Sequence, residues 1–185
     1  MEQLTALDER LFRLLNSLHT PTLDVAMYWI TDRWFWVPFY AVLIYLMFRY
    51  HGRQGLIVLI GVIVAASLAD RISSGFFKPF FARPRPCHAD NLEATVHLLN
   101  DRCGGAYGFV SSHAANTFAL ATYLQLWWRR FRWAWLLFVW AAVVSYSRIY
   151  VGVHYPADVV GGALLGALPA WGSYRAARAC ARWWA

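Results

Sequence analysis

The chain has 185 residues, of which 59% are hydrophobic and 15% are charged, and its formal net charge is +7. This apolar fraction exceeds that of ordinary soluble domains, and a soluble protein of this length would struggle to bury so much apolar surface. The basic residues lie at the ends of apolar runs, which is typical of loops that anchor membrane helices and argues against a nucleic-acid-binding face. We therefore expect one membrane-embedded domain over 1–185, in contact with membrane lipids and without a nucleic acid partner.

The first 33 residues are predicted to lie at the membrane surface. Within 3–18, leucines recur at helical spacing with charged residues between them, which predicts an amphipathic helix. The apolar stretch is too interrupted to span a bilayer, so we expect this helix to lie in the interface. A second short segment covers 21–33, and together these residues form the predicted interfacial N-terminal segment, 1–33.

Five longer apolar runs follow, and each has about the 17–25 residues that a bilayer core requires. They cover 34–50, 54–77, 112–129, 132–149 and 157–175. The sequence therefore predicts an all-α integral membrane helical bundle with five transmembrane helices, or six if the N-terminal segment supplies another. A Gly-x-x-x-Gly pattern at Gly162 and Gly166 indicates close helix packing within the bundle rather than dimerisation, and it defines no oligomeric state.

Arginines in the turns predict an orientation for this bundle. With five spans, three basic clusters share one side of the membrane: Arg49 with Arg53, Arg129 with Arg130 and Arg132, and Arg175 with Arg178 and Arg182. The positive-inside rule makes that side cytoplasmic. The loop 87–109 would then face the periplasm of a bacterial inner membrane, together with the polar segments that adjoin the other helix ends.

Three of these polar segments combine side chains that suit phosphoryl chemistry. The segment from Ser147 to Asp158 holds an Arg, a His and an Asp between two apolar runs, and ionisable residues beside a bilayer core usually mark function. The other two segments are 78–86 and 110–113. Arg and Lys can bind a phosphoryl oxyanion, His can act as a nucleophile or base, and Asp can orient that His.

In order and spacing, these segments resemble the three signature motifs of the type 2 phosphatidic acid phosphatase superfamily, which holds membrane lipid phosphate phosphatases and, more distantly, soluble vanadium haloperoxidases. Lys78 to Arg85-Pro86 matches Lys-x6-Arg-Pro, and Ser147 to Asp158 matches Ser-Arg-x5-His-x3-Asp in full. Val110-Ser111-Ser112-His113 matches Pro-Ser-Gly-His with two of four positions changed. The resemblance implies a bundle, typically of six helices, that hydrolyses lipid phosphates.

The resemblance also implies a role for each motif residue in a metal-independent reaction through a phosphohistidine. Lys78, Arg85 and Arg148 would surround the phosphoryl oxygens. Ser111 and the amide of Ser112, at the start of a helical run, would also hold the phosphate. His154 would be the nucleophile, Asp158 would orient it, and His113 would protonate the leaving oxygen. No metal and no cofactor are expected.

Several other polar residues leave alternatives open. Arg83, which is not a fixed motif position, would either contact a substrate headgroup or lie in a solvated loop. Asp70 and Arg71 would orient the site or pair within the bundle. The loop residues His88, Asp90, Glu93, His97 and Asp101 fit no common metal-ligand spacing, so we interpret them as loop polarity. Cys87 and Cys103 bracket that loop and could form a periplasmic disulfide, worth about 3 kcal/mol, or remain two buried thiols.

The predicted function is hydrolysis of a lipid phosphate or diphosphate at the periplasmic face of the membrane. Undecaprenyl diphosphate is the first choice of substrate, because this carrier is released on that side and three cations suit a diphosphate. The alternatives are a lipid A or phosphatidylglycerol phosphate phosphatase, and a lipid phosphotransferase with the same His-His-Asp core. A haloperoxidase would need vanadate in a soluble shell, and the apolar composition argues against it.

Overall fold

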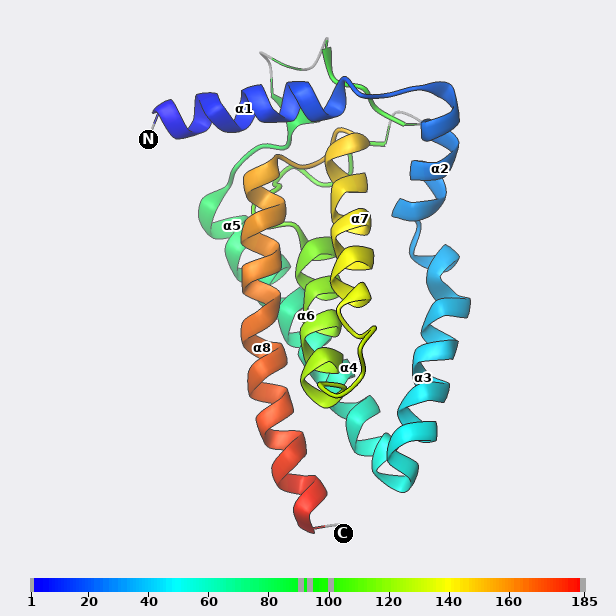
Figure 1. Ribbon diagram of the computed structural model, residues 1–185. Helices are drawn as coiled ribbons and strands as arrows, with labels where there is room; N and C mark the ends of the chain where they lie inside the picture. The colour runs from blue at the N-terminus through cyan, green and yellow to red at the C-terminus, as the bar shows by residue number, and fades with distance from the viewer. Residues whose placement is uncertain (1, 90–91, 93–94, 100–101, 184–185) are drawn as a thin grey trace.

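The computed structural model describes residues 2–89, 92, 95–99 and 102–183, and this part of the chain is built from α-helices (Figure 1). The helices are α1 (Glu2–Asn16), α2 (Pro21–Thr31), α3 (Val37–His51), α4 (Gly55–Ile72), α5 (Lys78–Phe81), α6 (Ser112–Trp127), α7 (Leu136–Tyr150) and α8 (Pro156–Trp183). A π-helical turn, Ser73–Phe77, joins α4 to α5. The predicted all-α fold is confirmed.

Helix α1 crosses one end of the bundle, at a steep angle to the long helices (Figure 1). Its buried residues are Asp8, Phe12 and Asn16, which recur every four residues, while the leucines on its remaining surface are largely exposed. The predicted amphipathic helix is therefore confirmed. Helix α2 instead runs along the side of the bundle above α3 (Figure 1), because the chain turns at Thr20, whose hydroxyl caps α2.

Helix α6 lies at the centre of the bundle and packs against α4, α7 and α8 (Figure 1). Small residues allow this close packing, since a Cβ atom at Gly162 or Gly166 would collide with the backbone at the start of α6. The Gly-x-x-x-Gly pattern thus serves contacts within the bundle. The close contact at these two glycines fixes the start of α8 against the start of α6, where two of the three motif segments lie.

The turns that carry the basic clusters meet at the end of the bundle opposite α1 (Figure 1). The indole Nε1 of Trp128 donates to His51 Nε2 over 3.2 Å, which places the α3–α4 turn beside the α6–α7 turn. Gln54 Nε2 donates to the carbonyl oxygen of Ala181 over 3.2 Å, so the end of α8 also lies there. The three arginine clusters therefore share one end, and the motif segments occupy the other.

Helices α7 and α8 differ clearly in their bounds from the predicted apolar runs. Helix α7 begins only at Leu136, because 128–135 form turns, whereas α8 continues to Trp183 because arginines favour helix beyond its apolar part. By length and apolar composition, the continuous helical stretch Arg33–Phe81 is the one in the described chain that could cross a membrane. Helix α7 is apolar but has 15 residues.

Candidate active site

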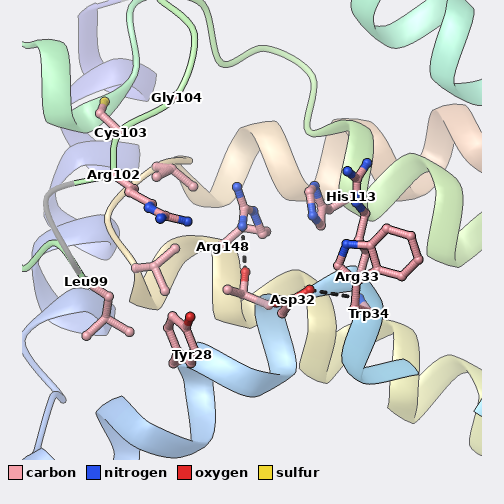
Figure 2. Close-up of a pocket in the computed structure, with 13 residues that line it drawn as sticks. Tyr28, Asp32, Arg33, Trp34, Leu99, Arg102, Cys103, Gly104, His113 and Arg148 are labelled. Atoms are coloured by element: carbon pink, nitrogen blue, oxygen red, sulfur yellow. Dashed lines mark hydrogen bonds between the residues drawn. The ribbon is translucent and has the colours of Figure 1, made fainter. Parts of the chain in front are cut away.

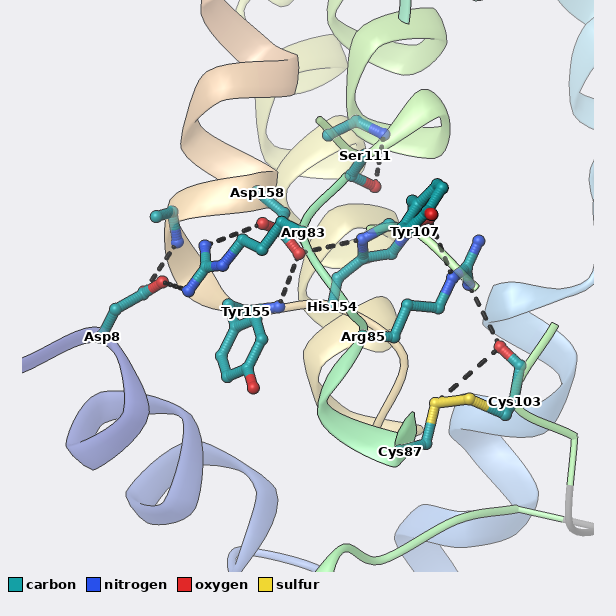
Figure 3. A network of polar contacts seen from close by, with 12 residues as sticks. Asp8, Arg83, Arg85, Cys87, Cys103, Tyr107, Ser111, His154, Tyr155 and Asp158 are labelled. Atoms are coloured by element: carbon teal, nitrogen blue, oxygen red, sulfur yellow. Dashed lines mark hydrogen bonds and ion pairs between the residues drawn. A yellow bond between two sulfur atoms is a disulfide. The ribbon is translucent and has the colours of Figure 1, made fainter. Parts of the chain in front are cut away.

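The three motif segments meet at the end of the bundle that α1 crosses (Figures 1 and 3). Lys78 opens α5, Ser111 precedes α6, and His154 lies in the loop between α7 and α8. The amide of Ser111 donates to the carbonyl oxygen of Asp158 over 2.9 Å, and the amide of Arg85 donates to the Ala106 carbonyl over 3.2 Å. These backbone bonds hold segments together that are far apart in the sequence.

His154 and Asp158 form a buried pair at the centre of the site (Figure 3), with side chains 2% and 0% exposed. The Nδ1 atom of His154 lies 3.3 Å from Oδ2 of Asp158, and the same oxygen accepts from the Tyr155 amide over 3.0 Å. Because α8 begins at Pro156, the carboxylate lies in its first turn, next to the preceding loop. This geometry suits an imidazole that donates from Nδ1 and keeps the lone pair on Nε2.

The surroundings of His154 favour its neutral form. Burial, and then the positive charges of Arg148, Arg85 and Lys78, lower the pKa of His154 well below 6.5. The imidazole is therefore neutral at pH 7, and its free nitrogen is available as a nucleophile.

Gly108 lies directly against the His154–Asp158 pair. A Cβ atom at this position would lie 2.8 Å from Oδ2 of Asp158 and 3.5 Å from Nδ1 of His154. The Gly108 amide donates to the carbonyl oxygen of Arg83 over 2.9 Å, which fixes the backbone in this position. Only glycine leaves the pair undisturbed here.

Three cations surround this pair, and the described residues accept from only some of their hydrogen-bond donors. Arg148 donates from Nη1 to Thr31 Oγ1 over 2.5 Å, but its buried Nε has no hydrogen-bond partner in the described chain. Arg85 is 8% exposed and donates to the carbonyl oxygens of Tyr107 and Cys103 over 3.3 and 3.1 Å. Lys78 interacts electrostatically with both arginines. A buried guanidinium donor without a partner is costly, and a bound oxyanion would satisfy it.

The start of α6 supplies the remaining motif residues. Ser111 is the N-cap residue, and its Oγ accepts from the Ala114 amide over 3.5 Å. The Oγ of Ser112 accepts a bond from Ser73 Oγ over 2.9 Å. His113 and Arg148 line a cleft of about 460 Å³ (Figure 2), a volume within the roughly 300–1,000 Å³ typical of small-molecule sites. The cleft therefore opens next to the residues expected to act as the acid and as a phosphate ligand.

Arg83 lies in the loop after α5 with its side chain 24% exposed, and its guanidinium is held by two carboxylates, which neither alternative considered from the sequence included. Its guanidinium donates to Oδ1 of Asp158 over 3.0 Å and to Oδ2 of Asp8 over 2.7 Å (Figure 3). It also lies over the ring of Tyr155, 4.1 Å from the ring centroid. The motif spacing could not reveal this, because the two carboxylates come from α1 and α8.

The other ambiguous residues lie apart from the His154–Asp158 pair. Asp70 accepts from Asn116 Nδ2 over 3.3 Å, which is pairing within the bundle, and it also interacts electrostatically with Lys78; Arg71 is exposed. His97 Nε2 lies 2.8 Å from Oδ1 of Asp24, at α2. His88 is exposed near Gly104, and Asp90, Glu93 and Asp101 lie outside the described residues.

Cys87 and Cys103 are joined by a disulfide in the structure (Figure 3). The bond connects the residue after Arg85-Pro86 to the segment that returns toward α6. Their ligand atoms lie within 4.8 Å of one another and of His88, but the bonded sulfurs are no longer thiolates that could bind a metal ion. The disulfide instead tethers the loop whose carbonyl oxygens receive the Arg85 donors.

Comparison with known proteins agrees with this arrangement. Residues 54–182 match the PAP2 superfamily, and this range contains all three motif segments. The chain belongs to the PAP2 superfamily. The predicted membership of the type 2 phosphatidic acid phosphatases is confirmed, and with it the prediction of a phosphatase at the level of the superfamily.

Two curated relatives and one solved structure illustrate the similarity. The chain is 36% identical to "Lipid A 4'-phosphatase" of Bacteroides thetaiotaomicron over 174 residues, covering 92% of this chain and 77% of that protein. It is 32% identical to "Undecaprenyl-diphosphatase" of Sulfolobus acidocaldarius over 169 residues, covering 89% of this chain and 76% of that protein. The crystal structure of Aquifex aeolicus LpxE superimposes with a TM-score of 0.66 at 28% identity, covering 91% and 95% of the two chains.

Sequence reasoning missed three residues that contact the motif residues or Arg83. Asp8 and Thr31 contact Arg83 and Arg148 from α1 and α2, and Gly108 contacts the His154–Asp158 pair. One signal was available for Asp8, since it shares a helical face with Phe12 and Asn16, away from the leucines. Nothing in the local sequence marks Thr31 or Gly108.

Proposed function

We propose that this chain hydrolyses a lipid phosphate through a covalent phosphohistidine, without a metal ion. The observation that carries the proposal is the buried, neutral His154 near Arg148, whose buried Nε has no partner among the described residues. A neutral imidazole is a competent nucleophile, and a vacant cationic donor beside it suits the oxygen of a phosphoryl group.

The proposed reaction has two steps. In the first, Nε2 of His154 bonds to phosphorus as the bond to the lipid oxygen breaks, and His113 gives its proton to that oxygen. Asp158 accepts the bond from Nδ1 and stabilises the charge that develops on the ring. In the second, water attacks the phosphohistidine while His113 takes up a proton, and inorganic phosphate leaves.

We place lipid A phosphate first among the substrates, ahead of undecaprenyl diphosphate, which the sequence alone favoured. The higher identity to a lipid A 4'-phosphatase supports this order. The cleft supports it as well, because two further arginines, the outer arginines Arg33 and Arg102, line it together with His113 and Arg148 (Figure 2). Neither outer arginine takes part in an ion pair with a described residue. These two arginines suit a sugar headgroup that carries a second anionic group.

Undecaprenyl diphosphate remains the second candidate. Its two phosphates are adjacent, so Lys78, Arg85 and Arg148 would bind both of them, and the outer arginines would have no partner. The relative from Sulfolobus acidocaldarius and the three central cations favour this reading. The two candidates therefore differ in how much they need Arg102.

A substrate comparison tests the reaction and the substrate together. Phosphate release would be measured in detergent micelles from bisphosphorylated lipid A, undecaprenyl diphosphate, phosphatidylglycerol phosphate and phosphatidic acid, for the wild type and His154→Ala. We expect the highest kcat/KM for lipid A and none of these activities in the variant. Equal rates in both proteins would refute the reaction, and a tenfold preference for undecaprenyl diphosphate over lipid A would refute the substrate.

Arg102→Gln sharpens the choice of substrate, with exposed Arg129→Gln at the opposite end of the bundle as the control. We expect kcat/KM to fall about tenfold for bisphosphorylated lipid A and to stay unchanged for phosphatidic acid, since one charged hydrogen bond is lost only with the former. An equal loss with both substrates would contradict a headgroup role for Arg102.

We further propose that five spans cross a bacterial inner membrane, formed by α2 with α3, α4, α6, α7 and α8, with the site at the periplasmic face. The three arginine clusters at the opposite end support this orientation through the positive-inside rule. Labelling of a cysteine placed at Arg130 should fail with an impermeant reagent in intact cells, in a background where the exposed Cys180 is replaced. Efficient labelling there would reverse the orientation.

A further inference from the structure

Arg83 is held from three directions at the edge of the candidate active site (Figure 3). Its two terminal nitrogens donate to different carboxylates, Nη1 to Asp158 over 3.0 Å and Nη2 to Asp8 over 2.7 Å. The flat face of the guanidinium lies on the ring of Tyr155, 4.1 Å from the centroid. A planar guanidinium with fixed donors suits such bridging, and a lysine could not reproduce it.

The two carboxylate oxygens of Asp158 have different hydrogen-bond partners, because one of them accepts from Arg83. Oδ2 faces Nδ1 of His154 at 3.3 Å and accepts from the Tyr155 amide, whereas Oδ1 receives the Arg83 donor. Rotation of the carboxylate about its last bond would exchange these oxygens or move both out of line. Arg83 opposes this rotation, so it defines the orientation in which His154 meets its acceptor.

Asp8 fixes the other side of Arg83 and also the start of α8. Its Oδ1 accepts from the amide of Ala157 over 2.9 Å, one of the N–H groups that a helix start leaves without a partner. Its Oδ2 accepts from Arg83, and the residue is 7% exposed. One carboxylate from α1 therefore holds both the helix that carries Asp158 and the arginine that orients it.

The rest of the buried face of α1 continues along the same loop. Phe12 packs edge-on against Tyr155, with 5.5 Å between ring centroids. Asn16 Nδ2 donates to the carbonyl oxygens of Tyr150 and Ile149 over 2.7 and 3.2 Å, at the end of α7. The face formed by Asp8, Phe12 and Asn16 thus contacts both ends of the loop that carries His154.

We infer that Arg83 and Asp8 are positioning residues for the catalytic pair, and that α1 acts through them as a clamp on the loop holding His154. The inference rests on the proposed roles of His154 and Asp158. Both residues act on Asp158 and the start of α8 rather than through a role in the proposed phosphate binding, so their removal should slow the chemical step and leave substrate binding intact. This role differs from the headgroup contact that the position of Arg83 first suggested.

The test uses Arg83→Gln, Asp8→Asn and the double variant of the full chain, with exposed Arg10→Gln on α1 as the control. For Arg83→Gln we expect kcat to fall about 10–100-fold, the loss typical when an outer partner of an active group is removed. The KM and the inhibition constant of inorganic phosphate should change less than about twofold, because the three central cations keep their places. Arg10→Gln should behave as wild type.

A double-mutant cycle distinguishes a shared network from two separate effects. We expect Asp8→Asn to cost less than Arg83→Gln, and the double variant to be no slower than Arg83→Gln alone, because both act on Asp158. Melting temperature in detergent identifies any variant that fails to fold. If Arg83→Gln fails to fold, Asp8→Asn still tests the inference, because it keeps the Arg83–Asp158 pair. Arg83→Lys should restore only part of kcat, since one ammonium cannot hold both carboxylates in this geometry.

Two results would overturn the inference while leaving the proposed function intact. One is a rise in KM with kcat unchanged in Arg83→Gln, which would make Arg83 a substrate contact. The other is strictly additive losses in kcat for the two single variants, which would separate Asp8 from Arg83. A wild type that is no more active than His154→Ala would instead refute the proposed function itself.

Discussion

Gly108→Ala is a small change with a large expected effect on catalysis. The added Cβ atom would lie 2.8 Å from Oδ2 of Asp158, closer than such atoms approach in real structures, and 3.4 Å from Cγ of Arg85. The carboxylate or the loop must therefore shift, which would disturb the 3.3 Å contact between Oδ2 and His154 Nδ1. Misplacement of a catalytic group by about 1 Å can cost about 100-fold in rate, which corresponds to about 2.7 kcal/mol in the activation free energy.

The assay compares kcat for Gly108→Ala with that of Gly105→Ala in the same loop, where a new Cβ meets nothing within 4 Å. We expect a loss of about 10–100-fold for Gly108→Ala and less than twofold for Gly105→Ala. Overpacking should also lower the free energy of unfolding by about 1–3 kcal/mol, visible as a lower melting temperature. In an Asp158→Asn background the added methyl group should cost little more. If Gly108→Ala kept over half of kcat, the pair would not be as tightly enclosed as described.

Three further predictions follow from the site and its loop. In single-turnover assays, His154→Ala should lose several orders of magnitude in kcat, and Asp158→Asn should lose fewer. Because the His154 pKa lies well below 6.5, protonation of this nucleophile should not reduce kcat/KM until the pH is well below that value. Activity should persist in chelator and fall with vanadate, and a Mg²⁺ requirement would refute the metal-free reaction. Non-reducing mass spectrometry should find Cys87 joined to Cys103, and reduction should cost about 3 kcal/mol in stability, seen as a lower melting temperature.

The helices could be predicted because their signals are local. Apolar runs of sufficient length predicted the long helices, and leucines at helical spacing predicted α1. The start of α7 was placed too early because Trp133 and Trp135 extend the apolar run, although they lie in turns. Composition alone cannot distinguish an aromatic turn at the membrane surface from the first turn of a helix.

The motif residues could also be found from the sequence, but their supporting contacts could not. Lys78, Arg148 and His154 stand at fixed spacings within their segments, so the chain itself displays them. The partners of Arg83 are separated from it by 75 residues in each direction, and no periodicity connects residues so distant. The lining of the cleft has the same origin, since Tyr28 and Asp32 belong to α2 and its C-cap, whereas Arg102 lies in the loop before α6.

The contact between Asp8 and the start of α8 also bears on when the enzyme becomes active during its own synthesis. Asp8 and Ala157 are separated by 149 residues, which a ribosome adds in about 7–30 s at roughly 5–20 residues per second. During that interval α1 has no α8 to bind, and Arg83 has only one of its two carboxylates. Until α8 has been synthesised, Asp158 cannot meet Arg83 and Asp8 cannot meet Ala157, so we expect phosphoryl chemistry to begin only after α8 has packed beneath α1.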